Sequence, residues 1–144
     1  FGTVEVRVFD AVPSVSEMCT LAALTQSLVV YLSEAYDDGN PLESLDSWVL
    51  VENKWRSTRY GLDADIIIDD MGNQESLKEF ILKTLDLLHE TSIRLGCNEY
   101  IEKIKNNIII NNSPYQRQLK SYHNNYNFLE VLENAVKELR MDIS

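Results

Sequence analysis

The sequence predicts a mostly α-helical chain with one β-strand near its amino-terminal end. Two observations support this prediction. Val4, Val6 and Val8 alternate with other residues between positions 2 and 10, which is the period-two pattern of a half-buried strand. From Ser14 onward, apolar residues instead recur at helical spacing, in segments separated by Gly, Pro and Asn residues.

The predicted strand, residues 2–10, would have two different faces. Residues two apart in a strand point the same way, so the valines form one face while Glu5 and Arg7 lie together on the other. The pair is either an ion pair on a solvated strand, worth about 1 kcal/mol or less, or part of a site. In a site, the carboxylate would suit a metal ion, and the guanidinium would suit a phosphate or carboxylate group. The residues alone leave both interpretations open and favour the first.

The composition limits the possible partners. The chain has 144 residues, 44% of them hydrophobic, enough for one domain or part of one. A formal net charge of −10 argues against a nucleic-acid partner and against a polybasic membrane contact. We also expect no membrane-spanning segment, since no apolar run approaches the roughly 20 residues needed to span a bilayer. Cys19 and Cys97 match no metal-ligand spacing, which indicates free thiols and a cytoplasmic location.

The beginning of the chain carries a further expectation. The sequence starts at Phe1 and enters the predicted strand almost at once. A single strand cannot form a sheet, and no other stretch is a convincing second strand. Ile66, Ile67 and Ile68 could form one, but the run is short. We therefore expect the chain to be a piece of a longer protein whose other strands lie upstream.

Six helices are expected after the strand. Ser14 and Glu17 form a capping-box pattern before the first helix, and Ser113, Pro114 and Gln116 fit the start of the fifth. The predicted ranges are about 14–36, 42–60, 74–95, 98–110, 114–122 and 127–141. Together with the strand they form a single predicted domain over residues 1–144.

Apolar stripes predict which helix faces are buried. For the second helix the buried stripe is expected to contain Leu45, Trp48, Val51 (or Glu52) and Trp55, and for the last helix Leu129, Leu132, Val136 and Leu139.

The second helix also carries a cationic cluster in its last turns. Asn53, Lys54, Arg56 and Arg59 lie there in an otherwise acidic chain. Cations are favourable near the negative end of a helix dipole, which is one explanation. Arginines beside tryptophans also suit the wall of a pocket that holds an anion. Both explanations remain open at this point.

Three stretches together resemble a known family. They are FGTVEVRVFDAVPS at residues 1–14, ENKWRSTRYGLDAD at residues 52–65 and SPYQRQL at residues 113–119. In this order and at about this spacing, they resemble the carboxy-terminal part of the carboxylate–amine ligases. These are proteins similar to glutamate–cysteine ligase that share a catalytic fold with glutamine synthetase. The resemblance covers nearly the whole chain, and the family protein is more than twice as long.

The resemblance implies a fold and a reaction. The chain would be the helical part of an α+β glutamine synthetase-like catalytic domain. ATP would phosphorylate the side-chain carboxylate of glutamate, and the amino group of a second substrate, such as cysteine, would attack the acyl phosphate. Magnesium ions and arginines would neutralise the charge that gathers on the phosphoryl oxygens.

The resemblance also implies roles for individual residues. Glu5 would be a magnesium ligand and Arg7 the catalytic anion-binding residue. Asn53, Arg56 and Arg59 would approach the nucleotide or the substrate. Arg117 and Gln118 match the family pattern without an implied role.

Two functions therefore remain in view. The first is part of an ATP- and Mg²⁺-dependent ligase with small-molecule substrates, inactive in isolation because its other metal carboxylates would lie upstream. We expect this chain to form a homo-oligomer, because its predicted strand would lack neighbours. The alternative is a non-catalytic acidic helical module that binds a protein. Such a module has no need for Glu5 and Arg7 together opposite three valines.

Overall fold

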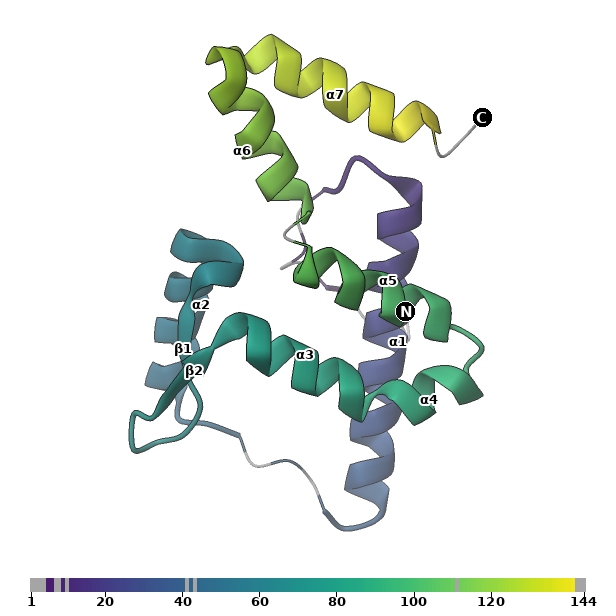
Figure 1. Cartoon of the computed structure of the whole chain (residues 1–144). Coiled ribbons are helices and arrows are strands. Elements are labelled where there is room, and N and C mark those ends of the chain that lie inside the picture. Colours follow the sequence, from purple (N-terminus) through teal and green to yellow (C-terminus); the bar gives the residue numbers. More distant parts are fainter. Residues whose placement is uncertain are drawn as a thin grey trace.

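The chain folds into a set of α-helices with one small sheet (Figure 1). The computed structural model describes residues 5–6, 9, 11–40, 42, 44–110 and 112–141. Its elements are α1 (Val15–Asp37), α2 (Ser47–Tyr60), the 3-10 turn η1 (Gly61–Asp63), β1 (Asp65–Ile67), β2 (Gln74–Ser76), α3 (Leu77–Leu87), α4 (His89–Arg94), α5 (Asn98–Ile109), α6 (Pro114–Asn125) and α7 (Phe128–Met141). The predicted mostly α fold class is confirmed.

The predicted amino-terminal strand lies largely outside the described residues. Within residues 2–10 the structure describes Glu5, Val6 and Phe9, and none of these three is in a strand. The other positions of that range, Arg7 among them, are not described. The strand therefore stays a prediction.

The strands that the structure does describe lie elsewhere. β1 and β2 pair antiparallel, with Asp65 opposite Ser76 and Ile67 opposite Gln74. The sequence interpretation was wrong at both segments, because it treated the isoleucine run as too short for a strand and began a helix at Gln74. Ile66 and Ile67 are buried beneath α2, and this tertiary contact stabilises strands that are too short to persist alone.

Several helix boundaries also differ from the prediction, and α6 continues to Asn125 rather than ending near Tyr122. α2 begins at Ser47 rather than near Leu42, and the N–H of Asp46, its N-cap residue, donates to the Asp70 carboxylate of the β1–β2 turn. The expected helix 74–95 is divided into two helices at Leu88, which has φ −83° and ψ −5° and caps both of them. This break separates α3 from α4 and leaves the Leu88 side chain fully buried.

The core lies between α1, α3 and α5. Leu85, Ile101 and Ile108 form its centre, and partly buried residues of α1, η1, α3 and α5 pack around them, namely Leu24, Leu62, Ile81, Leu82 and Ile104. α1 packs mainly on α5 and α4, whereas α2 packs mainly on β1 and η1. α1 and α2 follow one another along the chain, but each thus has its main contacts with other elements.

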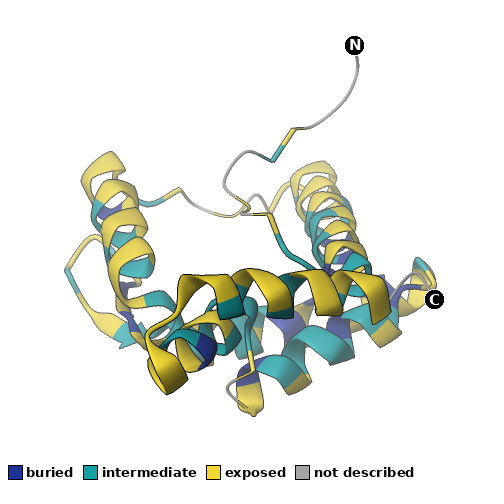
Figure 2. Cartoon of the chain, turned by 90° about the horizontal axis from the view of Figure 1, so that it is seen from above, coloured by how far each residue is buried: buried dark blue, intermediate teal, exposed yellow. Residues whose placement is uncertain are grey.

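Much of the helical surface is exposed (Figure 2), including most of both stripes that were expected to be buried; Leu45 is half-buried and precedes α2. α2 turns Trp48, Val51 and Trp55 outward and buries Val49 instead, because the Val49 face is the one that lies on β1. α7 has no buried residue among those described, and the residues of its expected stripe are exposed: Leu129, Leu132, Val136 and Leu139. α7 packs mainly on α6, so nothing described covers that face.

α1 corrects one more expectation. It has 23 residues and contains an 18-residue window with a mean hydropathy of 1.4, so by length and composition alone it could cross a bilayer. We expected no such run, because polar residues separate the aliphatic ones. A core helix of a soluble protein meets the same criteria, so the finding is a weak sign of membrane insertion. In this fold α1 packs on α4 and α5 and buries Glu17, Thr20 and Ser27.

Candidate functional site

Glu5, the predicted magnesium ligand, is exposed. Its predicted partner Arg7 lies outside the described residues, so the expected pairing on one strand face is not visible. Among the described residues, no group of three or more His, Cys, Asp or Glu side chains is arranged to hold a metal ion. Any magnesium site that included Glu5 would need further oxygen ligands.

Asn53 connects α2 to the small sheet. Its amide nitrogen donates to the Ile67 carbonyl at 2.7 Å, and its amide oxygen accepts from the Ile67 N–H at 2.8 Å. This double contact satisfies the backbone of β1 in the way a neighbouring strand would. In this structure Asn53 therefore holds β1 against α2, a function that the sequence did not reveal.

Arg56 lies beside Asn53 and also faces the sheet. Its Nε donates to Glu52 at 2.8 Å, and its Nη1 donates to the Asp65 carbonyl at 3.0 Å and to the Gln74 side chain at 2.8 Å. Arg56 lines two surface pockets, of about 470 and 390 Å³. Trp48 lines the first pocket and Trp55 the second. The expected arrangement of arginine beside tryptophans is therefore present, on an exposed face of α2.

Arg59 lies one turn further along α2 and is exposed. Its guanidinium carbon is 5.7 Å from the centre of the Tyr60 ring, within reach of a cation–π contact. Tyr60 in turn meets Trp55 edge to face, with ring centres 5.9 Å apart. Arg56 is engaged with the sheet, whereas Arg59 presents its charge on an aromatic surface.

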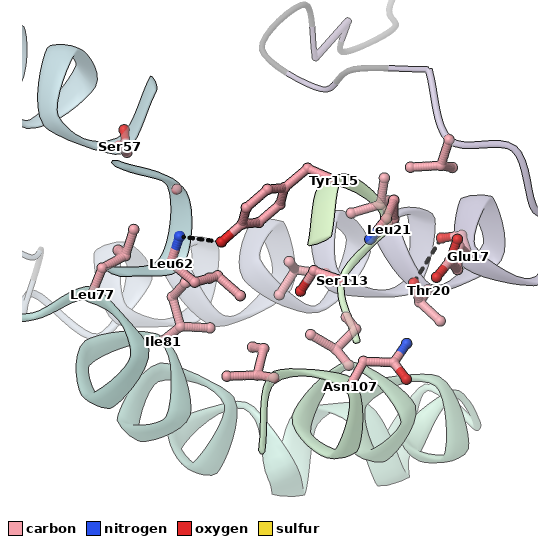
Figure 3. Close-up of a pocket in the computed structure, with 16 residues that line it drawn as sticks. Glu17, Thr20, Leu21, Ser57, Leu62, Leu77, Ile81, Asn107, Ser113 and Tyr115 are labelled. Carbon is pink, nitrogen blue, oxygen red and sulfur yellow. Dashed lines mark hydrogen bonds between the residues drawn. The ribbon is translucent and has the colours of Figure 1, made fainter. Parts of the chain in front are cut away.

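The three stretches that carry the family resemblance come together around one cavity (Figure 3). This central cavity has a volume of about 390 Å³, and side chains of α1, α3 and α5 form much of its wall. The first stretch contributes Val12, the second contributes Ser57, Gly61 and Leu62, and the third contributes Ser113, Pro114 and Tyr115.

Tyr115 joins the third stretch to the second. Its hydroxyl oxygen accepts a hydrogen bond from the Leu62 N–H at 3.1 Å, and Figure 3 shows the ring directed at that end of the cavity. Gly61 lies directly against the ring: a Cβ atom there would be 2.7 Å from Cζ of Tyr115. Gly61 also has φ 58° and ψ −136°, a region that only glycine adopts readily.

Arg117 joins the third stretch to the helix that follows the first. Its Nη1 and Nη2 donate to the two carboxylate oxygens of Glu17, each at 2.9 Å. Nε and Nη2 donate to Glu138 of α7 at 3.0 and 2.8 Å, and Nη1 donates to the Asn112 carbonyl at 2.7 Å. All five N–H donors of the guanidinium thus have a protein acceptor.

The surroundings of Arg117 make this contact electrostatically strong. Glu17 is buried, and the pair excludes water on the Glu17 side. Hydrogen bonds to Glu138 and then to Glu17 raise the pKa of Arg117 above its ordinary value. A guanidinium committed in this way binds protein carboxylates and has no donor left for a ligand.

Sequence reasoning did not find Glu17, Tyr115 or Arg117 as a connected set. Glu17 was interpreted only as part of a helix cap, and the Ser14 hydroxyl does accept from the Glu17 N–H at 3.2 Å. The one available signal was that Tyr115 and Arg117 lie within a stretch of the family pattern. Their partners are far away in sequence, and spacing along the chain cannot identify such contacts.

The fold is mostly helical, and the three stretches that resemble carboxylate–amine ligases meet around one cavity. Fold and site together therefore indicate a protein of the carboxylate–amine ligase class. The comparisons agree: the model of glutamate-cysteine ligase family 2 (GCS2) matches residues 1–138. The chain therefore belongs to the glutamate-cysteine ligase family 2.

Three relatives illustrate the similarity. "Putative glutamate–cysteine ligase 2" of Thermobifida fusca (strain YX) is 41% identical over 97% of this chain and 35% of its own length. The protein of the same name from Clavibacter sepedonicus is 40% identical over 97% of this chain and 37% of its own length. "Putative glutamate–cysteine ligase 2-1" of Arthrobacter sp. (strain FB24) is 35% identical over 96% of this chain and 36% of its own length. The chain thus spans about a third of the length of these curated relatives.

Proposed function

We propose that the chain is the carboxy-terminal portion of an ATP-dependent carboxylate–amine ligase that joins glutamate to an amine such as cysteine. The observation that carries this proposal is the family match over residues 1–138. The convergence of the three family-like stretches on one cavity supports it, because residues that serve one site are expected to meet in space. The alternative, a non-catalytic interaction module, has no comparable observation in its favour.

The proposed reaction has two steps. A side-chain carboxylate oxygen of glutamate attacks the γ-phosphorus of ATP, and the bond to ADP breaks. The amine nitrogen then attacks the carbonyl carbon of the acyl phosphate, loses a proton, and inorganic phosphate leaves with the oxygen that came from the carboxylate. Negative charge gathers on phosphoryl oxygens in both steps, so fixed cationic groups lower both barriers.

Magnesium, when bound, would supply part of that positive charge, and Glu5 would hold it. Mg²⁺ is commonly bound by one or two carboxylates together with waters and phosphate oxygens, so a single exposed carboxylate fits as one of several ligands. Arg7 would bind phosphoryl oxygens through its planar guanidinium. The remaining ligands would come from the two thirds of the relatives' length that this chain does not span.

The α2 residues would contribute to substrate binding in different ways. Arg59 presents an exposed charge beside Tyr60, so we propose it as the α2 residue that contacts a nucleotide or substrate anion. Asn53 and Arg56 hold β1 and β2 in place, so they would act mainly by positioning that surface. The two free thiols fit the proposed cytoplasmic location.

The test uses the gene that encodes these residues, expressed in full. With ATP, Mg²⁺, glutamate and cysteine, the protein should release phosphate and form an amide. Glutamate labelled with ¹⁸O in its side-chain carboxylate should transfer one labelled oxygen to the released phosphate. Amide formation without that transfer would rule out the acyl phosphate. This chain by itself is expected to release no phosphate above background.

Two substitutions test the assigned residues. Glu5→Gln removes the charge that a hard cation prefers, so activity should fall and excess Mg²⁺ should restore part of it. Arg7→Lys replaces a bidentate contact by a point charge and should lower turnover roughly a hundredfold, about 3 kcal/mol in the barrier. Thr3→Ser is the mild control on the same predicted face. If the two variants lose activity alike and neither responds to Mg²⁺, the pair is structural.

A further inference from the structure

Two residues of the third stretch, Tyr115 and Arg117, each hold one of the other two stretches. Tyr115 accepts the Leu62 N–H and packs on Gly61, so it holds the end of the second stretch. Arg117 donates two parallel hydrogen bonds to the Glu17 carboxylate, so it holds the first turn of α1. Glu17 lies three residues after the end of the first stretch. The start of α6 therefore spans the distance between them.

The main helix partners of α1 are α4 and α5, and those of α2 are β1 and η1. The shared core also connects the two regions, since Leu24 of α1 and Leu62 of η1 pack on the same cluster. Beyond that core contact, the relative position of the start of α1 and the end of α2 depends on polar groups that lie between them. Tyr115 and Arg117 lie there on one turn of α6, whose start is fixed by Pro114 and by the Ser113–Gln116 capping box.

We propose that Tyr115 and Arg117 are positioning residues of the ligase site. They set the distance between the start of α1, which follows the segment that carries Glu5, and the α2 surface that carries Arg59. This inference rests on the proposed function for its catalytic consequence. Arg117 itself does not bind a substrate anion, because its five donors are already used by Glu17, Glu138 and Asn112.

The structure offers a matched control for Arg117. Arg94 also makes two parallel bonds to a glutamate of α1, at 2.8 and 2.7 Å to Glu34, but at the opposite end of that helix. Arg94→Lys therefore changes the same kind of contact without touching the α6 connection. For Tyr115→Phe the control is Tyr122→Phe, which lies on the same helix within an aromatic cluster.

The first experiment measures turnover of the protein expressed in full. Arg117→Lys keeps the positive charge but loses the two parallel hydrogen bonds to Glu17. We expect kcat to fall about tenfold or more and KM for ATP to change little, because a misplaced catalytic group slows the chemical step more than it weakens substrate binding. Combined with Glu5→Gln, the loss should be smaller than the product of the single losses, since both act through one site. Combined with Arg94→Lys, the losses should multiply. Multiplicative losses with Glu5→Gln would overturn the proposal.

The second experiment does not depend on activity. In this chain, spin labels at Cys19 of α1 and at a Thr58→Cys position of α2, both exposed, report the α1–α2 distance; buried Cys97 is replaced by Ser. Arg117→Lys and Tyr115→Phe should broaden or shift the distance distribution, whereas Arg94→Lys and Tyr122→Phe should leave it unchanged. An unchanged distribution in the first two variants refutes the positioning role. Absence of ligase activity, with the distance result as expected, refutes only the proposed function.

Discussion

The two ends of α1 are held by the same chemical contact in different surroundings. At the first turn, Arg117 makes two parallel bonds to Glu17, and near the last turn Arg94 does the same to Glu34. The side chains of the first pair are 22% and 9% exposed, whereas those of the second are 56% and 46% exposed. The same arginine–glutamate geometry is thus largely shielded from water in the Arg117–Glu17 pair and open to water in the Arg94–Glu34 pair.

This difference decides what each pair contributes. An exposed pair gains little, because water and salt screen it and two flexible side chains must be ordered. Removal of one member of a buried pair instead leaves a charge without water or partner. Glu138 adds a second acceptor to Arg117, which connects α7 to α1 through one guanidinium. Bond lengths alone would not distinguish the two ends.

The largest expected effect follows from removal of Arg117. Arg117→Ala leaves the buried Glu17 carboxylate and Glu138 without their cation and should lower the free energy of unfolding by about 3 kcal/mol, the lower end of the range for broken buried pairs since two of the groups are partly exposed. Urea unfolding followed by circular dichroism measures it. Arg94→Ala is the comparison, and equal losses from the two variants would show that burial is not the deciding factor.

The next effect tests the other connection made by α6. Gly61→Ala places a Cβ atom 2.7 Å from the Tyr115 ring in a backbone region that alanine avoids, and should cost about 2 kcal/mol. Gly39→Ala is a matched control, because Gly39 has φ 75° but no atom within 4 Å of the added Cβ. If both variants lose the same stability by thermal unfolding, the contact with Tyr115 adds nothing.

A smaller loss is expected from the Tyr115 hydroxyl. Tyr115→Phe removes the acceptor of the half-buried Leu62 N–H and should cost about 1 kcal/mol. Hydrogen exchange should show faster exchange of the Leu62 amide, with amides at the far end of α1 unaffected. A Leu62 amide that keeps its protection would contradict the hydrogen bond.

The smallest effect belongs to the exposed pair and depends on pH. The hydrogen bond from Arg94 lowers the pKa of Glu34 below its ordinary value of 4.5. A depressed folded-state pKa means that the contribution is present above pH 4.5 and is lost as the pH falls through the lowered pKa. Glu34→Gln should therefore match the wild type in acid and fall slightly below it near pH 7 at low salt. A gap that persists at high salt would argue against an exposed ion pair.

The sequence by itself determined the local features. Ser113, Pro114 and Gln116 begin α6 as predicted, because capping depends on residues three positions apart. α2 ends at Tyr60, as the predicted range 42–60 had it, and Gly61 follows because its positive φ favours glycine. The three family-like stretches were also recognisable from the sequence, because each is a pattern of neighbouring residues that does not depend on contacts with distant parts of the chain.

Tertiary structure decided the rest. The outward turn of Trp48 and Trp55 depends on β1, which lies against the Val49 face of α2 and exists as a strand partly through Asn53. The pairing of Arg117 with Glu17 joins residues 100 positions apart. Periodicity describes a helix face but not the surface it meets, and a charged residue has many candidate partners along the chain. Only the folded chain selects among them, because burial and geometry exist only once the elements have packed.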